Sequence, residues 1–131
     1  IELSKTMAPY GGVYITHMRS EADKLLEAID EAIEIGRKGG VPVEIYHLKA
    51  AGKRNHPKMA QAIAKIHDAR AQGLDVQANM YPYTQGGTGL SACLPPWAIA
   101  GGKLFENLQS KEKRQKMREE IVADAGGWEN L

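Results

Sequence analysis

The first 80 residues alternate between two hydrophobic periods, one typical of strands and one typical of helices. Apolar residues recur at helical spacing, as at Leu25, Ile29 and Ile33, and predict helices over about 21–38 and 57–73. Three short runs rich in β-branched and aromatic residues predict buried strands, over 13–18, 41–46 and 74–80. This order is typical of two right-handed crossover units, so we expect an α/β fold with three parallel strands covered by helices.

Local signals support the helix boundaries. Ser20 followed three residues later by Asp23 predicts an N-terminal cap for the first helix, and Gly39-Gly40 predicts its end. Pro57 suits the first turn of the second helix, which Gly73 should end. The sequence therefore predicts two helices of ordinary length between the three strands.

The regular alternation ends after residue 83. Residues 84–103 contain five glycines and a Pro-Pro pair, and predict a long loop. A charged helix is expected from Ser110 to about Asp124, followed at 128–131 by the approach to another element. The opening residues contain no initiator methionine and read as the last turns of a helix. We therefore expect residues 1–131 to be an internal fragment forming a single partial domain, with its core over about 11–83 and a loop and helical segment over about 84–131.

Composition narrows the possible partners and compartment. The formal charge is +1, from 17 basic and 16 acidic residues, so we expect neither nucleic acid nor an anionic membrane as a partner. No apolar run approaches the roughly 20 residues that a membrane helix needs. Cys93 is the only cysteine, which excludes an intrachain disulfide and fits a reducing, cytoplasmic location.

Residues capable of metal binding and catalysis stand at the carboxyl end of each predicted strand. His17 lies near the end of the first strand, His47 and Lys49 follow the second, and Tyr81 follows the third. Functional side chains in parallel α/β proteins gather at the carboxyl ends of the strands. We expect these four side chains to meet at one edge of the sheet.

His17 and His47 could share one zinc ion, because neighbouring strands lie about 4.8 Å apart and neutral imidazole is a good zinc ligand. The alternative is that each histidine only satisfies backbone groups at its strand end. Two histidines are also too few for zinc, which takes four ligands. Lys49 could pair with a substrate carboxylate or be a solvated lysine, and Tyr81 could donate a hydrogen bond to a polarised carbonyl or be structural.

Three segments resemble the D-aminoacylase, or N-acyl-D-amino-acid deacylase, family of amidohydrolases. The resemblance lies in the order and spacing of the motifs GGVYITHMRSE at 11–21, VPVEIYHLKAAG at 41–52, and YPYT at 81–84 with TGLS at 88–91 and LPPW at 94–97. It implies a zinc-dependent (β/α)8 barrel of which these strands would be roughly the fifth, sixth and seventh. It also implies that His17 and His47 are zinc ligands, that Lys49 binds the α-carboxylate of an N-acyl-D-amino acid, and that Tyr81 lines the site near the scissile amide.

Several parts of the family's site have no match in this sequence. We expect three of these parts outside this chain: the general-base aspartate, the His-x-His pair on the first strand of the family's barrel, and the cysteine ligand. In addition, the serine that the family often has after the YPY motif is replaced here by Gly87. We therefore expect the isolated chain to be inactive and to bind zinc weakly. Its open sheet edges could lead to self-association. The alternative function is a non-catalytic α/β binding or oligomerising domain with structural histidines.

Overall fold

The structure is a computed structural model that describes residues 1–123, in which the chain divides into two compact units, Ile1–Pro82 and Tyr83–Leu131. The predictions for Asp124 and for the stretch 128–131 lie outside the described residues. The division into units does not test whether the whole chain is one partial domain. That organisation remains a prediction.

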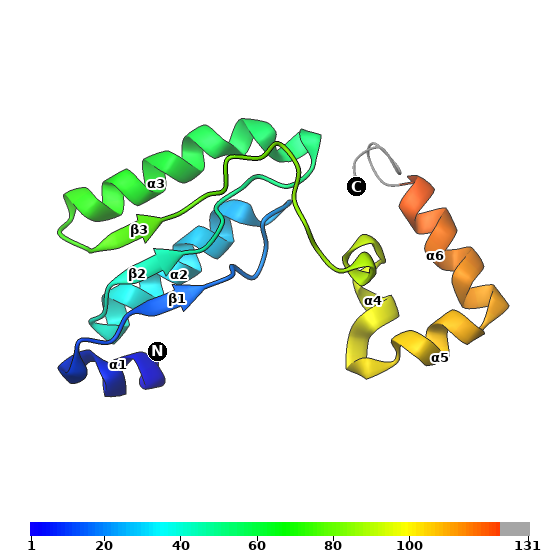
Figure 1. Cartoon of the computed structure of the whole chain (residues 1–131), viewed down its shortest axis with the longest axis horizontal. Coiled ribbons are helices and arrows are strands. Elements are labelled where there is room, and N and C mark those ends of the chain that lie inside the picture. The colour runs from blue at the N-terminus through cyan, green and yellow to red at the C-terminus, as the bar shows by residue number, and fades with distance from the viewer. Residues whose placement is uncertain (124–131) are drawn as a thin grey trace. The chain divides into compact units, whose positions relative to one another are not determined.

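The first unit is a three-stranded parallel sheet with its connecting helices (Figure 1). The strands are paired in parallel in chain order, β1 (Tyr14–Thr16), β2 (Val43–Ile45) and β3 (Val76–Ala78). The other elements are α1 (Glu2–Met7), the 3-10 helices η1 (Ala8–Tyr10) and η2 (Lys53–Lys58), and the crossover helices α2 (Leu25–Gly39) and α3 (Met59–Ala71). The predicted α/β class and the parallel order of the strands are confirmed, although each strand is shorter than expected.

The start of α2 differs from the prediction. The helix begins at Leu25 rather than near residue 21, and Lys24 takes the N-cap position. The Ser20 hydroxyl accepts a hydrogen bond from the Ala22 N–H at 3.3 Å, while Asp23 pairs with Arg54. The predicted cap is wrong because both side chains are used to shape the loop that precedes the helix.

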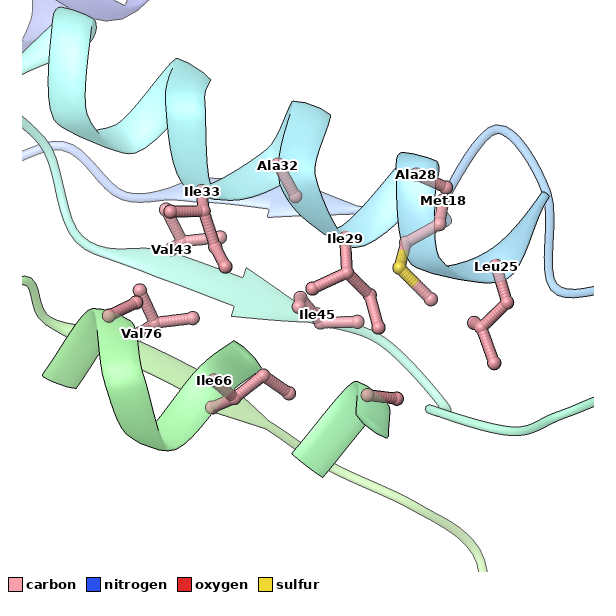
Figure 2. Close-up of a cluster of buried hydrophobic side chains, with 12 residues drawn as sticks. Met18, Leu25, Ala28, Ile29, Ala32, Ile33, Val43, Ile45, Ile66 and Val76 are labelled. Atoms are coloured by element: carbon pink, nitrogen blue, oxygen red, sulfur yellow. The ribbon is translucent and has the colours of Figure 1, made fainter. Parts of the chain in front are cut away.

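The core lies between one face of the sheet and helices α2 and α3 (Figure 2). Val43 and Ile45 of β2 pack in one cluster with Ile29 of α2 and Ile66 of α3. Residues on the opposite side of the strands, such as Ile15 at 48% exposed, lie outside this cluster, in which both crossover helices take part. Within the first unit, the two crossover helices therefore cover one face of the sheet.

The buried face of α3 differs slightly from the sequence-based prediction. Ala62, Ile66 and Ala69 are buried, whereas Ile63 is 46% exposed. The apolar spacing of Met59, Ile63, Ile66 and Ala69 predicts one face of this helix, but Ala62 rather than Ile63 is buried in the cluster that also contains residues of α2. Small side chains at this contact allow the two helices to approach closely.

Gly36 is a position where the close approach of α2 to the sheet can be tested. A Cβ at this position would overlap Val43 Cγ2 and lie 3.2 Å from the Val41 carbonyl oxygen. We expect Gly36→Ala to destabilise the fold by roughly 1–3 kcal/mol through overpacking, although alanine favours helix by about 1 kcal/mol. Chemical denaturation measures this cost. A smaller penalty in a Val43→Ala background would assign it to this contact, whereas an equal penalty would contradict that explanation.

The second unit contains more helix than the sequence predicted. Its elements are η3 (Leu90–Cys93), α4 (Pro96–Ile99), η4 (Ala100–Gly102), α5 (Leu104–Gln109) and α6 (Lys111–Ala123). The buried Asn107 donates to the Ala98 carbonyl at 3.0 Å and accepts from Lys113 Nζ at 2.7 Å. The charged helix is confirmed through Ala123, but the predicted loop holds short helical turns because tertiary contacts of this kind support them.

Two further findings concern the predicted partners. Within residues 1–123, no helix has the length and apolar character needed to span a membrane. The outer edges of β1 and β3 pair with no further strand in the described part of the chain. Self-association through these edges stays a prediction.

Candidate metal centre

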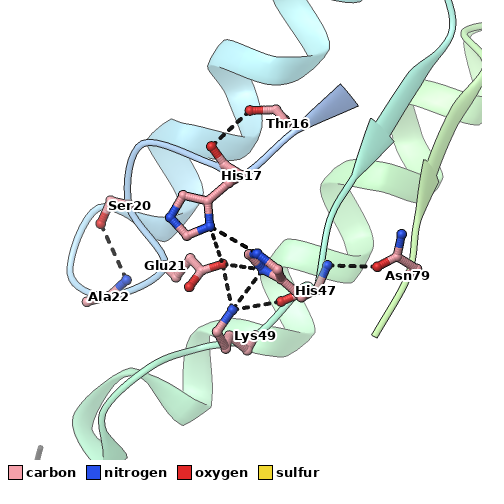
Figure 3. Close-up of polar contacts among 8 residues, drawn as sticks. All are labelled: Thr16, His17, Ser20, Glu21, Ala22, His47, Lys49 and Asn79. Carbon is pink, nitrogen blue, oxygen red and sulfur yellow. Dashed lines mark hydrogen bonds and ion pairs between the residues drawn. The ribbon is translucent and has the colours of Figure 1, made fainter. Parts of the chain in front are cut away.

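The loops that leave β1 and β2 bring two histidines together (Figure 3). Thr16 and Ile45, the last residues of the two strands, are register partners, and the Tyr46 N–H donates to the Thr16 carbonyl at 2.9 Å. His17 Nδ1 lies 3.0 Å from His47 Nε2, and the two ring centroids are 4.8 Å apart. The pairing of the strands therefore places both imidazoles at one edge of the sheet.

The two ring nitrogens have a spacing close to that of a metal site. Nitrogens bound at 2.0–2.1 Å to a tetrahedral zinc ion are about 3.3 Å apart. The observed 3.0 Å between His17 Nδ1 and His47 Nε2 needs only a small opening to match this value. In the described range, His17, Glu21 and His47 form the group of potential ligands whose atoms lie within 4.8 Å of one another. The donor types and their spacing fit zinc.

Glu21 is a central member of this cluster that the sequence did not single out. Its Oε1 lies 2.7 Å from His47 Nδ1, 2.7 Å from Lys49 Nζ and 3.7 Å from His17 Nδ1. Arg19, for which the local sequence offers Glu21 or Asp23 as an ion-pair partner, binds Glu31 at 3.0 Å instead. A carboxylate four residues after a strand-end histidine was the signal that could have identified it.

Lys49 lies beside His47, as predicted. β2 ends at Ile45 and His47 has a φ of 41°, so the loop after the strand, not an extension of the strand, brings the two residues together. The Lys49 ammonium donates to Glu21 Oε1 and, at 3.0 Å, to the His47 carbonyl oxygen. It lies 5.7 Å from the ring centroid of Tyr81. All four predicted residues are thus connected through the loop at the end of β2.

Asn79, just after β3, holds the backbone of His47. Its Oδ1 accepts a hydrogen bond from the His47 N–H at 2.8 Å, and its carbonyl oxygen accepts one from the Leu48 N–H at 2.8 Å. Its Nδ2 donates to Glu44 Oε1 at 2.7 Å. A positive φ is uncommon outside glycine and persists where surrounding contacts impose it. Asn79 supplies such contacts from the neighbouring strand end.

The two loops of the centre are also tied together farther from the histidines. The Ala51 N–H donates to the Glu21 carbonyl oxygen at 2.7 Å, and the Lys58 ammonium donates to the Asp23 carbonyl oxygen at 2.6 Å. Arg54 donates to both carboxylate oxygens of Asp23 and holds the pKa of that carboxyl below its usual value. These contacts hold the two loops against each other beside the centre.

Removing the Asn79 side chain should loosen the centre without unfolding the sheet. We expect Asn79→Ala to cost roughly 0.5–1.5 kcal/mol, because exposed hydrogen bonds contribute modestly. Hydrogen exchange of the His47 amide should become faster, since that N–H loses its acceptor. Exchange at Ile45, within β2, is the internal control. Unchanged protection at His47 would show that the loop conformation does not depend on Asn79.

Sequence and structure comparisons place this chain among known proteins. No family model matches the sequence. Over 88 residues it is 38% identical to the D-aminoacylase of Alcaligenes xylosoxydans xylosoxydans, covering 67% of this chain and 18% of that protein. Over 81 residues it is 36% identical to the N-acyl-D-glutamate deacylase of the same organism, covering 62% of this chain and 17% of that protein. The chain therefore spans less than a fifth of the length of these curated relatives.

Solved structures give the same result. A crystal structure of D-aminoacylase, described as defining a novel subset of amidohydrolases, matches with a TM-score of 0.60 and 40% identity over 63% of this chain and 17% of that one. The N-acyl-D-glutamate deacylase from Bordetella bronchiseptica, complexed with zinc and a phosphonate inhibitor that mimics the tetrahedral intermediate, matches with a TM-score of 0.60 and 32% identity over 62% of this chain and 17% of that one. This chain is therefore homologous to part of the D-aminoacylase and N-acyl-D-amino-acid deacylase family of amidohydrolases.

Proposed function

We propose that this chain is part of a zinc-dependent amidohydrolase barrel that hydrolyses the amide bond of N-acyl-D-amino acids. The observation that carries the proposal is the 3.0 Å approach of His17 Nδ1 and His47 Nε2 at the carboxyl edge of a parallel sheet. The homologous proteins are D-amino-acid deacylases, and one of their structures contains zinc. A (β/α)8 barrel also has helices on only one face of its sheet, as does the first unit of this chain.

The proposed roles follow from the positions of the side chains. His17 and His47 would hold the ion, which when bound supplies Lewis acidity and an activated water for attack on the amide carbonyl. Lys49 would bind the α-carboxylate of the substrate and Tyr81 would donate a hydrogen bond toward the oxygen of the scissile amide. The proton-accepting aspartate remains expected outside this chain.

The present contacts of Lys49 bear on how the substrate would bind. Its ammonium has three N–H donors, of which one points to Glu21 and one to the His47 carbonyl. Nζ also lies 2.8 Å from His47 Nδ1, so a substrate carboxylate would compete with Glu21 or with this contact. Lys49→Ala should therefore weaken substrate binding more than it slows turnover.

A chimera tests the proposal. Residues 11–82 of this chain would replace the homologous segment of the Alcaligenes D-aminoacylase, and hydrolysis of N-acetyl-D-amino acids would be measured against their L-enantiomers. We expect D-selective hydrolysis that is lost in the same chimera carrying His47→Ala, while Lys49→Ala should mainly raise KM. A folded chimera without activity would contradict the proposal. The isolated 131-residue chain should show no turnover.

A further inference from the structure

Glu21 occupies a restrained position in the loop between β1 and α2. Its side chain is only 12% exposed, and its carbonyl oxygen is fixed by the Ala51 N–H at 2.7 Å. Its Oε1 lies 2.7 Å from both His47 Nδ1 and Lys49 Nζ (Figure 3). One carboxylate oxygen therefore joins the side chain proposed to hold the metal and the side chain proposed to hold the substrate.

The two ring nitrogens of His47 have different neighbours. Nε2 faces His17, whereas Nδ1 faces Glu21. An ionised carboxylate can only accept a hydrogen bond, so this contact favours the proton on Nδ1. The lone pair is then on Nε2 and is directed toward His17, where a metal ion would need it.

Lys49 introduces a competing arrangement. Its Nζ is 2.8 Å from the same Nδ1, and a hydrogen bond donated there would put the ring proton on Nε2 instead. That proton would point at His17 and block the shared lone-pair site. Glu21 counters this arrangement, because its oxygen attracts both the Nδ1 proton and an ammonium proton of Lys49.

We propose that Glu21 is a positioning residue that fixes His47 with its proton on Nδ1 and its Nε2 lone pair toward His17, while holding Lys49 beside the same ring. This inference rests on the proposed metal site for its purpose. The contact itself does not require the metal, which allows the two to be tested separately. Carboxylates that accept from the second nitrogen of a metal-binding histidine raise metal affinity, and their loss typically weakens it about 10–100-fold.

The experiment reads the tautomer of His47 directly in the full chain. Long-range ¹H–¹⁵N correlation spectra of the metal-free protein, at a pH where the imidazoles are neutral, distinguish the two ring tautomers. We expect the Nδ1–H form in the wild type, retention of that form in Glu21→Gln, whose amide oxygen can still accept, and a shift toward the Nε2–H form in Glu21→Ala. The control is Glu31→Ala, which removes an exposed carboxylate bound to Arg19 and should change nothing at His47.

Zinc titration against a competing chelator gives the second measurement. Glu21→Ala should weaken binding about 10–100-fold, with partial recovery in Glu21→Gln and none of this loss in Glu31→Ala. A wild-type His47 with its proton on Nε2, or equal tautomers and zinc affinities in Glu21→Ala and Glu31→Ala, would overturn the inference. Should no variant bind zinc while the tautomer still responds to Glu21, the role of Glu21 stands and the proposed metal site fails. If Glu21→Ala does not fold, the wild-type spectrum still tests the inference, because it shows which nitrogen of His47 carries the proton.

Discussion

Replacing His17 and His47 together with alanine is expected to abolish specific zinc binding by this chain. Each imidazole supplies one of two nitrogens 3.0 Å apart, and Glu21, the remaining member of the cluster, cannot hold the ion alone. Loss of a ligand should exceed the roughly 10–100-fold loss caused by removing a supporting residue. Elemental analysis of the purified protein and a chelator-competition titration would measure the effect.

The matched control removes the other two histidines. His56 and His67 are both exposed and lie outside the cluster, so His56→Ala/His67→Ala changes the histidine content equally without touching the centre. We expect this control to retain zinc and the His17→Ala/His47→Ala variant to lose it. Equal zinc content in both double variants would contradict the assignment. Absence of zinc from every form, even after titration, would contradict the prediction and would fit either a barrel fragment too incomplete to hold its ion or an α/β domain with structural histidines.

Ile29→Ala is expected to cause a large loss of stability. Ile29 of α2 is fully buried, in the cluster that joins both crossover helices to β2. Truncation of a buried isoleucine typically costs about 2–5 kcal/mol, from lost transfer free energy and from the cavity left behind. That is a large part of the roughly 5–15 kcal/mol that stabilises an ordinary domain.

Ile63→Ala is the control for this substitution. It makes the same Ile-to-Ala change within α3, so the change in helix propensity is the same. The side chain removed is 46% exposed, so far less buried surface is lost than at Ile29. We expect a cost below about 1 kcal/mol there. Urea denaturation of both variants gives the two free energies of unfolding. Similar values would show that the core does not depend on the packing of α2 against the sheet.

The order of secondary-structure elements in the first unit could be predicted, because each strand and helix has its own hydrophobic period. The exact boundaries could not. The loop 21–24 was predicted as helix, yet Asp23 binds Arg54, which is 31 residues away. The short helices between Leu90 and Gln109 were missed since their support comes from contacts such as that between Asn107 and Lys113, not from a repeating pattern.

The sequence by itself determined the three parallel strands and the arrival of His17, His47, Lys49 and Tyr81 at one edge, because strand order and parallel pairing follow from local periodicity and crossover handedness. Only the tertiary structure placed Glu21 against His47 and Lys49, and only it showed the positive φ of His47, whose N–H donates to the side chain of Asn79. These contacts join residues about 30 positions apart in irregular loops. Such loops have no hydrophobic period, so their conformation is decided when the paired strands bring them side by side.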